Sequence, residues 1–224
     1  MVITRRPLAK RRDLIRVFAE DRVVAVIRVG SAEVADSAAR MLAEAGVRLI
    51  EITLTVPDAF EVISRLATDD AIGERGAVIG AGTVLSGAQA EDALLAGARF
   101  LVSPILVPEM IEVARSHDVM TMPGTMTPTE IVRAAELGAD YIKIFPIQSL
   151  GGPAYLANVR RAIMHLPLVP TGNIELAEIP AYFEAGAAGF GIGAPLVRAD
   201  LVEKGDRAGA VANAKRFLEA TKKK

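Results

Sequence analysis

The chain has 224 residues, of which 51% are hydrophobic, 24% charged and 4% aromatic, and its formal net charge is -1. A sequence with no cysteine excludes disulfides, a cysteine nucleophile and thiolate metal sites, and two histidines, His117 and His165, leave little for a histidine metal centre or a Ser-His-Asp triad. The balance of charge argues against a nucleic-acid binder, so we expect any chemistry to come from Lys, Glu, Asp, Arg, Ser, Thr, Tyr or the backbone.

The first twelve residues, MVITRRPLAKRR, contain five basic residues but no apolar core of the kind that signal peptides have. We interpret them as the approach to a helix at roughly Pro7 to Glu20, with a membrane-surface or targeting role as the alternative. The apolar stretch 23–27 is far shorter than the ~20 residues that span a bilayer. We therefore expect a cytoplasmic protein that binds neither membrane nor nucleic acid.

Short apolar or β-branched runs recur along the whole chain. Most are apolar almost throughout, which is typical of strands buried on both faces. They lie at residues 23–29, 49–54, 77–82, 100–104, 119–124, 141–146, 168–173 and 189–194. Successive runs start 19 to 28 residues apart, which leaves room for one helix and two short loops between strands.

The segments between these runs have helical spacing. One helix is predicted over 32–45, and a second over 127–137, where Thr127 is the expected N-cap and Pro128 the first helical residue. Glycines stand where helices should end, just before strands, as C-caps in the left-handed conformation. They are Gly46, Gly97, Gly138 and Gly186. The segment 202–209 reads as a loop before the last helix.

Eight strand–helix units in a chain of this length predict an α/β fold, a closed (β/α)8 barrel in a single domain over residues 1–224. The helix before the first strand would cover the N-terminal end of this barrel. The alternative is a doubly wound open sheet, which would need a glycine-rich turn after its first strand to bind a dinucleotide. That turn is Arg28-Val29-Gly30-Ser31, without the G-x-G-x-x-G spacing.

Two charged residues stand inside apolar strands, Glu51 and Lys143, each between two isoleucines. An ionised, unpaired side chain there would cost several kcal/mol or more. We interpret Lys143 as an amine whose pKa burial lowers, so that it attacks a carbonyl and forms a Schiff base while Glu51 shuttles protons. The alternatives are a purely structural Lys143–Glu51 salt bridge, or a lysine that extends from a strand end to solvent. Glu51 would itself favour the charged lysine, and the sequence does not decide which effect is larger.

The other strand ends carry uncharged polar residues, which suit a carboxylate or a sugar chain. Arg28 is the other cation expected near this rim, to pair with an anionic substrate group; the alternative is a surface arginine. The loops after the seventh and eighth strands contain Gly172-Asn173 and Gly191 to Ala194, where barrels often bind phosphate through backbone amides.

In order along the chain, AVIRV, LIEITLTVPDA, VIGAGTVL, FLVSP, MPGTMTPTE, YIKIFP, VPTGN and GIGAPLV resemble the 2-keto-3-deoxy-6-phosphogluconate (KDPG) aldolases, also called 4-hydroxy-2-oxoglutarate (KHG) aldolases. The resemblance covers about residues 23–197. It implies a class I aldolase on a (β/α)8 barrel, usually a homotrimer. Such an enzyme cleaves a 2-keto-4-hydroxy acid to pyruvate and an aldehyde, with no metal and no cofactor.

Carried over by position, the resemblance makes Lys143 the Schiff-base lysine, Glu51 the general acid/base and Thr83 the residue that holds the pyruvate carboxylate. Pro104 and Phe145 match walls of the pocket. Arg28 matches an arginine found near the substrate in part of the family. The full set of predicted substrate contacts is Arg28, Thr53, Thr55, Thr83, Pro104, Phe145, Thr171, Gly172, Asn173, Gly193 and Ala194.

Three positions depart from the common family pattern. Thr55 stands where many members have Arg, Asn173 where a second Gly is common, and Ala194 where a Ser is common. The last two fall on the expected phosphate site, where a lost hydroxyl removes a hydrogen bond worth ~1.5–3 kcal/mol. We expect an aldolase for KDPG, KHG or both. The alternatives are the same chemistry on an unphosphorylated 2-keto-3-deoxy sugar acid, a sugar-phosphate epimerase or isomerase, and a non-enzymatic barrel that serves as an oligomer building block.

Overall fold

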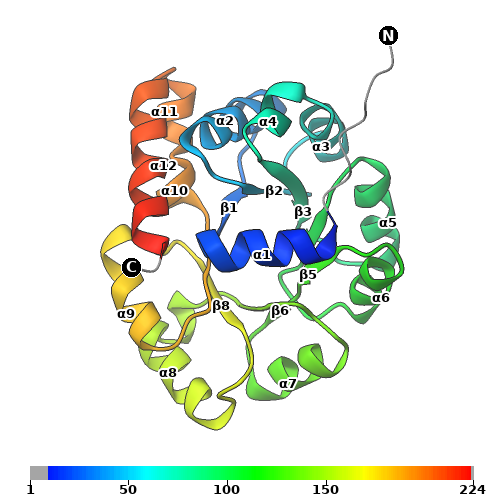
Figure 1. Ribbon diagram of the computed structural model, residues 1–224, viewed down its shortest axis with the longest axis vertical. Coiled ribbons are helices and arrows are strands. Elements are labelled where there is room, and N and C mark those ends of the chain that lie inside the picture. The colour runs from blue at the N-terminus through cyan, green and yellow to red at the C-terminus, as the bar shows by residue number, and fades with distance from the viewer. Residues whose placement is uncertain (1–9, 223–224) are drawn as a thin grey trace.

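The computed structural model describes residues 10–222, and its strands form a closed, all-parallel barrel with the helices outside (Figure 1). The strand order is β5-β4-β3-β2-β1-β9-β8-β7-β6. The strands are β1 (Val23–Ile27), β2 (Leu49–Thr53), β3 (Val78–Gly82), β4 (Phe100–Val102), β5 (Met120–Met122), β6 (Gly124–Thr125), β7 (Ile142–Ile144), β8 (Leu168–Gly172) and β9 (Phe190–Ile192). Every predicted strand is present, so the predicted barrel is confirmed and the open-sheet alternative is wrong.

The fifth predicted strand is split in two at Pro123, between β5 and β6. Proline has no N–H to donate, so the ladder cannot continue through it. β5 pairs with β4 on one side, β6 pairs with β7 on the other, and the Pro123 carbonyl accepts from the backbone N–H of Lys143 at 3.0 Å. β5 and β6 are consecutive in the chain and stand at the two ends of the strand order. Together they therefore act as one strand that closes the barrel between β4 and β7.

The helices pack on the outside of the barrel (Figure 1). They are α2 (Ala32–Ala45), α3 (Ala59–Ala67), α4 (Asp70–Glu74), α5 (Gly87–Leu95), α6 (Pro108–Ser116), α7 (Pro128–Glu136), α8 (Gly152–Ala162), α9 (Ile179–Glu184), α10 (Ala194–Val197), α11 (Ala199–Glu203) and α12 (Arg207–Thr221), with 3-10 turns η1 (Gln148–Leu150) and η2 (Leu176–Glu178). The prediction of one loop over 202–209 is wrong, because α11 runs into it and α12 starts within it.

The helix ends follow the predicted chemistry. Thr127 and Glu130 form a reciprocal capping box at the start of α7. Gly46 takes φ 95° and its N–H bonds back to α2, as a left-handed C-cap requires. Gly97, Gly138 and Gly186 also have positive φ. These four glycines follow α2, α5, α7 and α9, where the chain turns from the helix toward the next strand.

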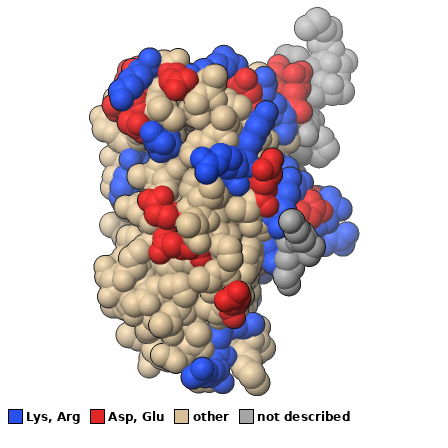
Figure 2. Space-filling view, turned by 90° about the vertical axis from the view of Figure 1, so that its left-hand side faces the viewer, with Lys and Arg blue, Asp and Glu red and all other residues tan. Residues whose placement is uncertain are grey.

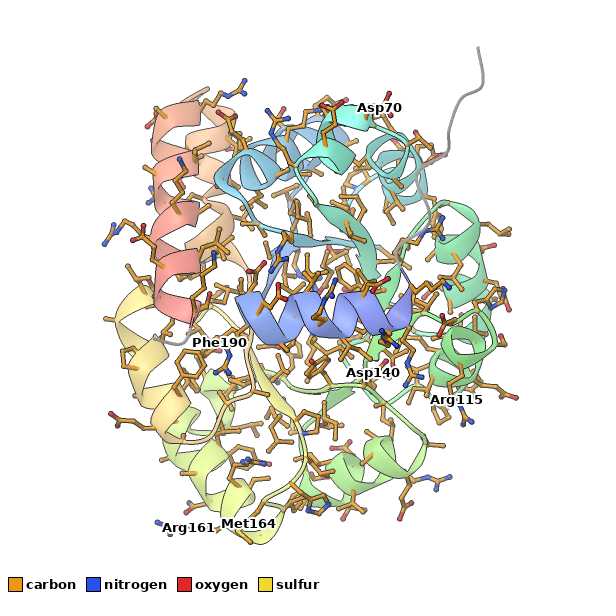
Figure 3. All side chains as sticks on the ribbon, viewed as in Figure 1. Asp70, Arg115, Asp140, Arg161, Met164 and Phe190 are labelled. Carbon is orange, nitrogen blue, oxygen red and sulfur yellow. The ribbon has the colours of Figure 1, made fainter. Side chains whose placement is uncertain are left out.

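Helix α1 (Arg11–Asp21) lies across the N-terminal end of the barrel (Figure 1). Leu14 and Phe18 are buried in the same cluster as inward-facing strand residues, and the Phe18 and Tyr141 ring centroids are 4.3 Å apart. Arg11 pairs with Asp140 at 2.6 Å, directly beside the helix (Figure 3). The start of the predicted helix, residues 7–9, lies outside the described residues. Because α1 closes this end, the C-terminal ends of the strands form the accessible end.

The surface carries charges of both signs. Figure 2 shows basic and acidic residues intermingled around uncharged surface on the face that includes α9 to α12, in line with the near-zero net charge. Between residues 10 and 222, no helix combines the length and apolarity that crossing a bilayer requires.

Candidate active site

Glu51 on β2 and Lys143 on β7 both point into the barrel. Side chains alternate along a strand, and Leu49 and Tyr141, two residues before each, belong to the inner cluster beneath α1. The isoleucines that flank each charged residue pack outward against the helices. Only 1% of Glu51 and 4% of Lys143 is exposed, so the alternative of a lysine that extends to solvent is wrong.

The Glu51 carboxyl group lies against the backbone of Gly82, at the end of β3. A β-carbon at Gly82 would collide with the carboxyl group, so steric space explains why a glycine occupies this position of the GAGT segment. The Oε1 atom is buried and has no hydrogen-bond partner among residues 10–222. A buried polar atom left without a partner costs about 1–3 kcal/mol, and hydrogen bonding to a ligand inside the barrel would remove that cost.

Lys143 has no ion pair within 4.0 Å among the described residues, Glu51 included. Its Nζ atom lies 4.9 Å from the centroid of the Phe145 ring, two residues further along the chain. The structural salt bridge between Lys143 and Glu51 that the sequence left open is therefore not formed. The amine sits in the barrel interior against an aromatic face, available to a ligand.

Burial sets the protonation of both groups. It lowers the pKa of Lys143 below its ordinary value, with the Glu51 charge opposing the shift and the Arg28 charge adding to it. Burial also raises the pKa of Glu51, against the opposing charges of Lys143 and Arg28. Both shifts favour the neutral forms, so burial outweighs the mutual attraction of the pair. A neutral amine and a protonated carboxyl group are the forms that Schiff-base chemistry needs at its first steps.

Arg28 follows β1 and reaches across to the ends of β2 and β3. Its Nη1 atom donates to the Thr55 hydroxyl at 3.0 Å, and its Nη2 atom donates to the Thr83 hydroxyl at 3.0 Å. No carboxylate among residues 10–222 lies within 4.0 Å of the guanidinium. The side chain is exposed but tied to two predicted substrate contacts, with its charge left for an anionic ligand.

Thr53 and Thr55 lie side by side at the end of β2. The buried Thr53 hydroxyl donates to the Ile27 carbonyl at 3.0 Å and lies 2.9 Å from the Thr55 hydroxyl. Thr83, after β3, takes φ 60°, an uncommon conformation for a residue with a branched side chain. The structure thus joins three of the predicted substrate contacts to Arg28 in one hydrogen-bonded group.

Two predicted wall residues, Pro104 after β4 and Phe145 after β7, are both partly buried and lie on either side of the β5–β6 segment. Gly124, on β6, packs so closely on the Pro104 backbone that a β-carbon there would collide with it. The Ser103 hydroxyl donates to the Ile105 carbonyl at 2.6 Å and so fixes the turn after β4. These contacts hold the wall beside Lys143.

The expected phosphate site lies at the ends of β8 and β9. Gly172 has φ 151°, and the Gln148 carboxamide lies where a β-carbon of Gly172 would be. The Asn173 Oδ1 atom is 3.4 Å from the position of a β-carbon at Gly193, so these two rim positions adjoin. Thr171 is buried and its hydroxyl donates to the Val169 carbonyl at 3.2 Å. Ala194 is exposed at the start of α10.

Gln148 was not predicted from the sequence. It lies in η1, five residues after Lys143, and it brings a second neutral carboxamide beside Asn173 to this part of the rim. A polar residue just after a strand that carries the reactive lysine was the available signal. Within residues 10–222, no three His, Cys, Asp or Glu side chains are grouped so that they could hold a metal ion.

The family model for KDPG and KHG aldolase matches residues 14–213. A 2-dehydro-3-deoxy-phosphogluconate aldolase of Treponema pallidum (strain Nichols) is 37% identical over 161 residues, 72% of this chain and 75% of that protein. A probable 2-dehydro-3-deoxy-6-phosphogalactonate aldolase of Rhizobium meliloti (strain 1021) is 35% identical over 180 residues, 80% of this chain and 83% of that protein.

Among solved structures, the chain is similar to the KDPG aldolase of Legionella pneumophila, in which pyruvate is captured at low pH as a covalent carbinolamine. The TM-score is 0.77 at 25% identity, and the match covers 93% of this chain and 98% of that one. A 3-hexulose-6-phosphate synthase matches at 20% identity with a TM-score of 0.65, a likeness of fold alone.

Proposed function

Because the chain belongs to the KDPG and KHG aldolase family, we propose that it reversibly cleaves KDPG, KHG or both to pyruvate and an aldehyde. The aldehyde is glyceraldehyde 3-phosphate from the first substrate and glyoxylate from the second. The observation that carries the proposal is the buried pair of Lys143 and Glu51, in which burial favours a neutral amine beside a protonated carboxyl group. Both lie near the accessible end of the barrel, where barrel enzymes place their chemistry.

The first half of the reaction joins lysine and substrate. The neutral Nζ atom of Lys143 attacks the C2 carbonyl carbon, and a C–N bond forms as the carbonyl oxygen takes up a proton. The resulting carbinolamine loses its hydroxyl as water with a proton donated by Glu51, which leaves a C=N⁺ bond to the lysine. Glu51 is then a carboxylate beside an iminium, two charges that stabilise each other where water is scarce.

The second half breaks the carbon–carbon bond. The Glu51 carboxylate accepts the proton of the C4 hydroxyl, the C3–C4 bond breaks, and C4 leaves as the carbon of an aldehyde. The bonding pair moves into the C2–C3 bond and neutralises the iminium, which produces an enamine on Lys143. Protonation of C3 by Glu51, followed by attack of water on C2, releases pyruvate and restores the free amine.

The two ends of the substrate would meet different chemistry. Arg28 and Thr83 place a cation and a hydroxyl at the rim beside Lys143, which suits the carboxylate of the keto acid. At the other side of the rim, Gln148 and Asn173 present carboxamides and Ala194 has no hydroxyl for a phosphate. The alternative substrates are therefore the unphosphorylated 2-keto-3-deoxy acids, in both the gluconate and the galactonate series.

We also propose a homotrimer. Leu85, Ile105 and Met126 follow β3, β4 and β6, so they lie on successive parts of the rim, and 50%, 56% and 43% of these residues is exposed. Adjacent exposed apolar side chains are typical of association surfaces. Light scattering of the eluted protein would give three times the 23.7 kDa chain mass, and a monomer mass would refute the assembly.

Product analysis tests the activity. The purified chain is incubated with KDPG, KHG and the unphosphorylated 2-keto-3-deoxygluconate, and pyruvate release is followed over time. We expect pyruvate from KDPG or KHG, and at least a ~10⁴-fold loss in Lys143→Met because the nucleophile is removed. Conversion of a sugar phosphate to an isomer without pyruvate would replace this proposal with the epimerase or isomerase alternative.

A further inference from the structure

The hydroxyls at the end of β2 have a defined hydrogen-bond direction. The Thr53 hydroxyl lies 3.0 Å from the Ile27 carbonyl, which can only accept, so Thr53 donates its single proton there. Toward Thr55, at 2.9 Å, Thr53 can then only accept, so Thr55 donates. With its proton used, Thr55 can only accept from Arg28, which has donors alone. The Ile27 carbonyl, the two threonine hydroxyls and the Arg28 guanidinium therefore each have one possible arrangement of donated and accepted hydrogen bonds, and these arrangements are mutually consistent.

The other nitrogen of Arg28 extends this order to Thr83. Because the Thr83 oxygen accepts from Nη2 at 3.0 Å, its own proton is not used in that bond. The Thr83 hydroxyl donates to no group among residues 10–222, so its proton is free to point at a ligand. Arg28 thereby polarises the hydroxyl that the family resemblance places on the pyruvate carboxylate.

We propose that Thr53 and Thr55 are positioning residues, a one-way hydrogen-bond relay from the Ile27 carbonyl that fixes the Arg28 guanidinium and, through it, the donor proton of Thr83. The assignment rests on the proposed aldolase function and replaces direct substrate contact as the role of these two threonines. Without the relay, a long, exposed arginine that has no carboxylate partner would keep most of its rotamer freedom. Substrate binding would then have to meet the entropy cost of ordering this side chain, and the relay removes that cost.

By holding the Arg28 guanidinium, the relay also holds a positive charge that acts on Lys143 and Glu51. The Arg28 charge lowers the pKa of Lys143 and opposes the raised pKa of Glu51. A guanidinium released from Thr55 spends less time near the barrel interior and has a smaller effect on Lys143. Loss of the relay should therefore move the pH dependence of the reaction, which a purely structural role for Thr55 would leave in place.

The test is a double-mutant cycle on Thr55 and Arg28. Thr55 is exposed, so Thr55→Val removes the hydroxyl without disturbing the core, and Thr55→Ser restores it. We expect Thr55→Val to lower kcat/KM about tenfold, mostly through KM, and to shift the acid limb of the pH profile to higher pH, while Thr55→Ser recovers most of the loss. In an Arg28→Met background, Thr55→Val should add less than about twofold, because the partner it positions is gone.

The matched control is Thr68→Val, at the exposed C-terminal end of α3 and so toward the N-terminal end of the barrel, away from the rim, which should leave kcat/KM and the pH profile unchanged. Equal effects of Thr55→Val with and without Arg28, or an unmoved pH profile, would overturn the relay.

A second readout needs no turnover. In ¹⁵N-arginine spectra, the Arg28 Nη–H signals, identified by their loss in Arg28→Met, should be resolved in the wild type and in Thr55→Ser but averaged in Thr55→Val. Averaged signals in the wild type would refute the relay. Resolved signals from a chain that releases no pyruvate would instead refute the proposed function alone, so the two failures are distinguishable.

Discussion

Replacing Glu51 by Gln separates the chemistry of the carboxyl group from its packing. Glutamine keeps the shape that lies against Gly82 but can neither donate an acidic proton nor accept one. Glu51 is 1% exposed, and its Oε1 atom has no hydrogen-bond partner among the described residues. Proton transfer by a positioned side chain contributes about 10²–10⁴-fold, so we expect Glu51→Gln to lower kcat by that factor, or about 3–5 kcal/mol in the activation barrier.

The same substitution should leave Lys143 able to react. The Glu51 charge opposes the lowering of the Lys143 pKa, so removing it makes the neutral amine easier to form. Steady-state kinetics and borohydride trapping of pyruvate should therefore diverge, with slow turnover but a trapped adduct at saturating pyruvate. Glu61→Gln, an exposed change on α3, is the control and should match the wild type in both assays. A Glu51→Gln variant with kcat within about fivefold of the wild type would refute the acid/base role.

Stability against pH gives an independent check with a worked sign. Folding raises the Glu51 pKa from 4.5, so this group's contribution to stability is complete below pH 4.5 and is lost as the pH rises through the raised pKa. Lys143 has its pKa lowered from 10.5, so the unfolded chain binds more protons between the lowered value and 10.5, and stability rises with pH through that window. Relative to the wild type, Glu51→Gln should gain stability in thermal melts as the pH rises above 4.5 toward the raised pKa of Glu51; a stability difference that does not change with pH would show that the pKa of Glu51 is not perturbed.

Three further outcomes follow from the packing. Gly82→Ala should lower kcat by at least about tenfold and stability by about 1–3 kcal/mol, because its β-carbon collides with the Glu51 carboxyl group; wild-type kinetics would contradict that contact. Phe18→Ala should cost about 3–5 kcal/mol in denaturant unfolding, because the ring fills the barrel end against Tyr141, and a loss below about 1 kcal/mol would contradict the capping role of α1. Ala194→Ser should raise kcat/KM about tenfold for phosphorylated over unphosphorylated keto acids, and an equal change for both would show that position 194 does not contact phosphate.

Much of the fold could be predicted from local sequence patterns. Buried parallel strands are apolar throughout, so the eight runs could be located from composition, and capping glycines such as Gly46 mark where helices end. The split at Pro123 could not be placed in the same way, because whether a proline interrupts a strand depends on which neighbours need its missing N–H. Helix α11 was missed because its five residues leave too short a pattern to recognise.

The reactive pair was predictable for a different reason. A charged residue within an apolar strand needs an explanation, and the sequence alone singles out Lys143 and Glu51 on this ground. Whether burial or mutual attraction controls their protonation needed the three-dimensional distances, because the two residues are 92 positions apart in the chain. The hydrogen bonds of Arg28 were also out of reach, since they join the ends of three different strands through side-chain rotamers.

The most direct test of the central claim is the mass of the protein after incubation with pyruvate and borohydride. A Schiff base reduced on the enzyme leaves a stable secondary amine that peptide mapping can locate. We expect one adduct per chain, on the peptide that contains Lys143, absent in Lys143→Met and retained in Glu51→Gln. No adduct at saturating pyruvate, or an adduct on another lysine, would contradict it.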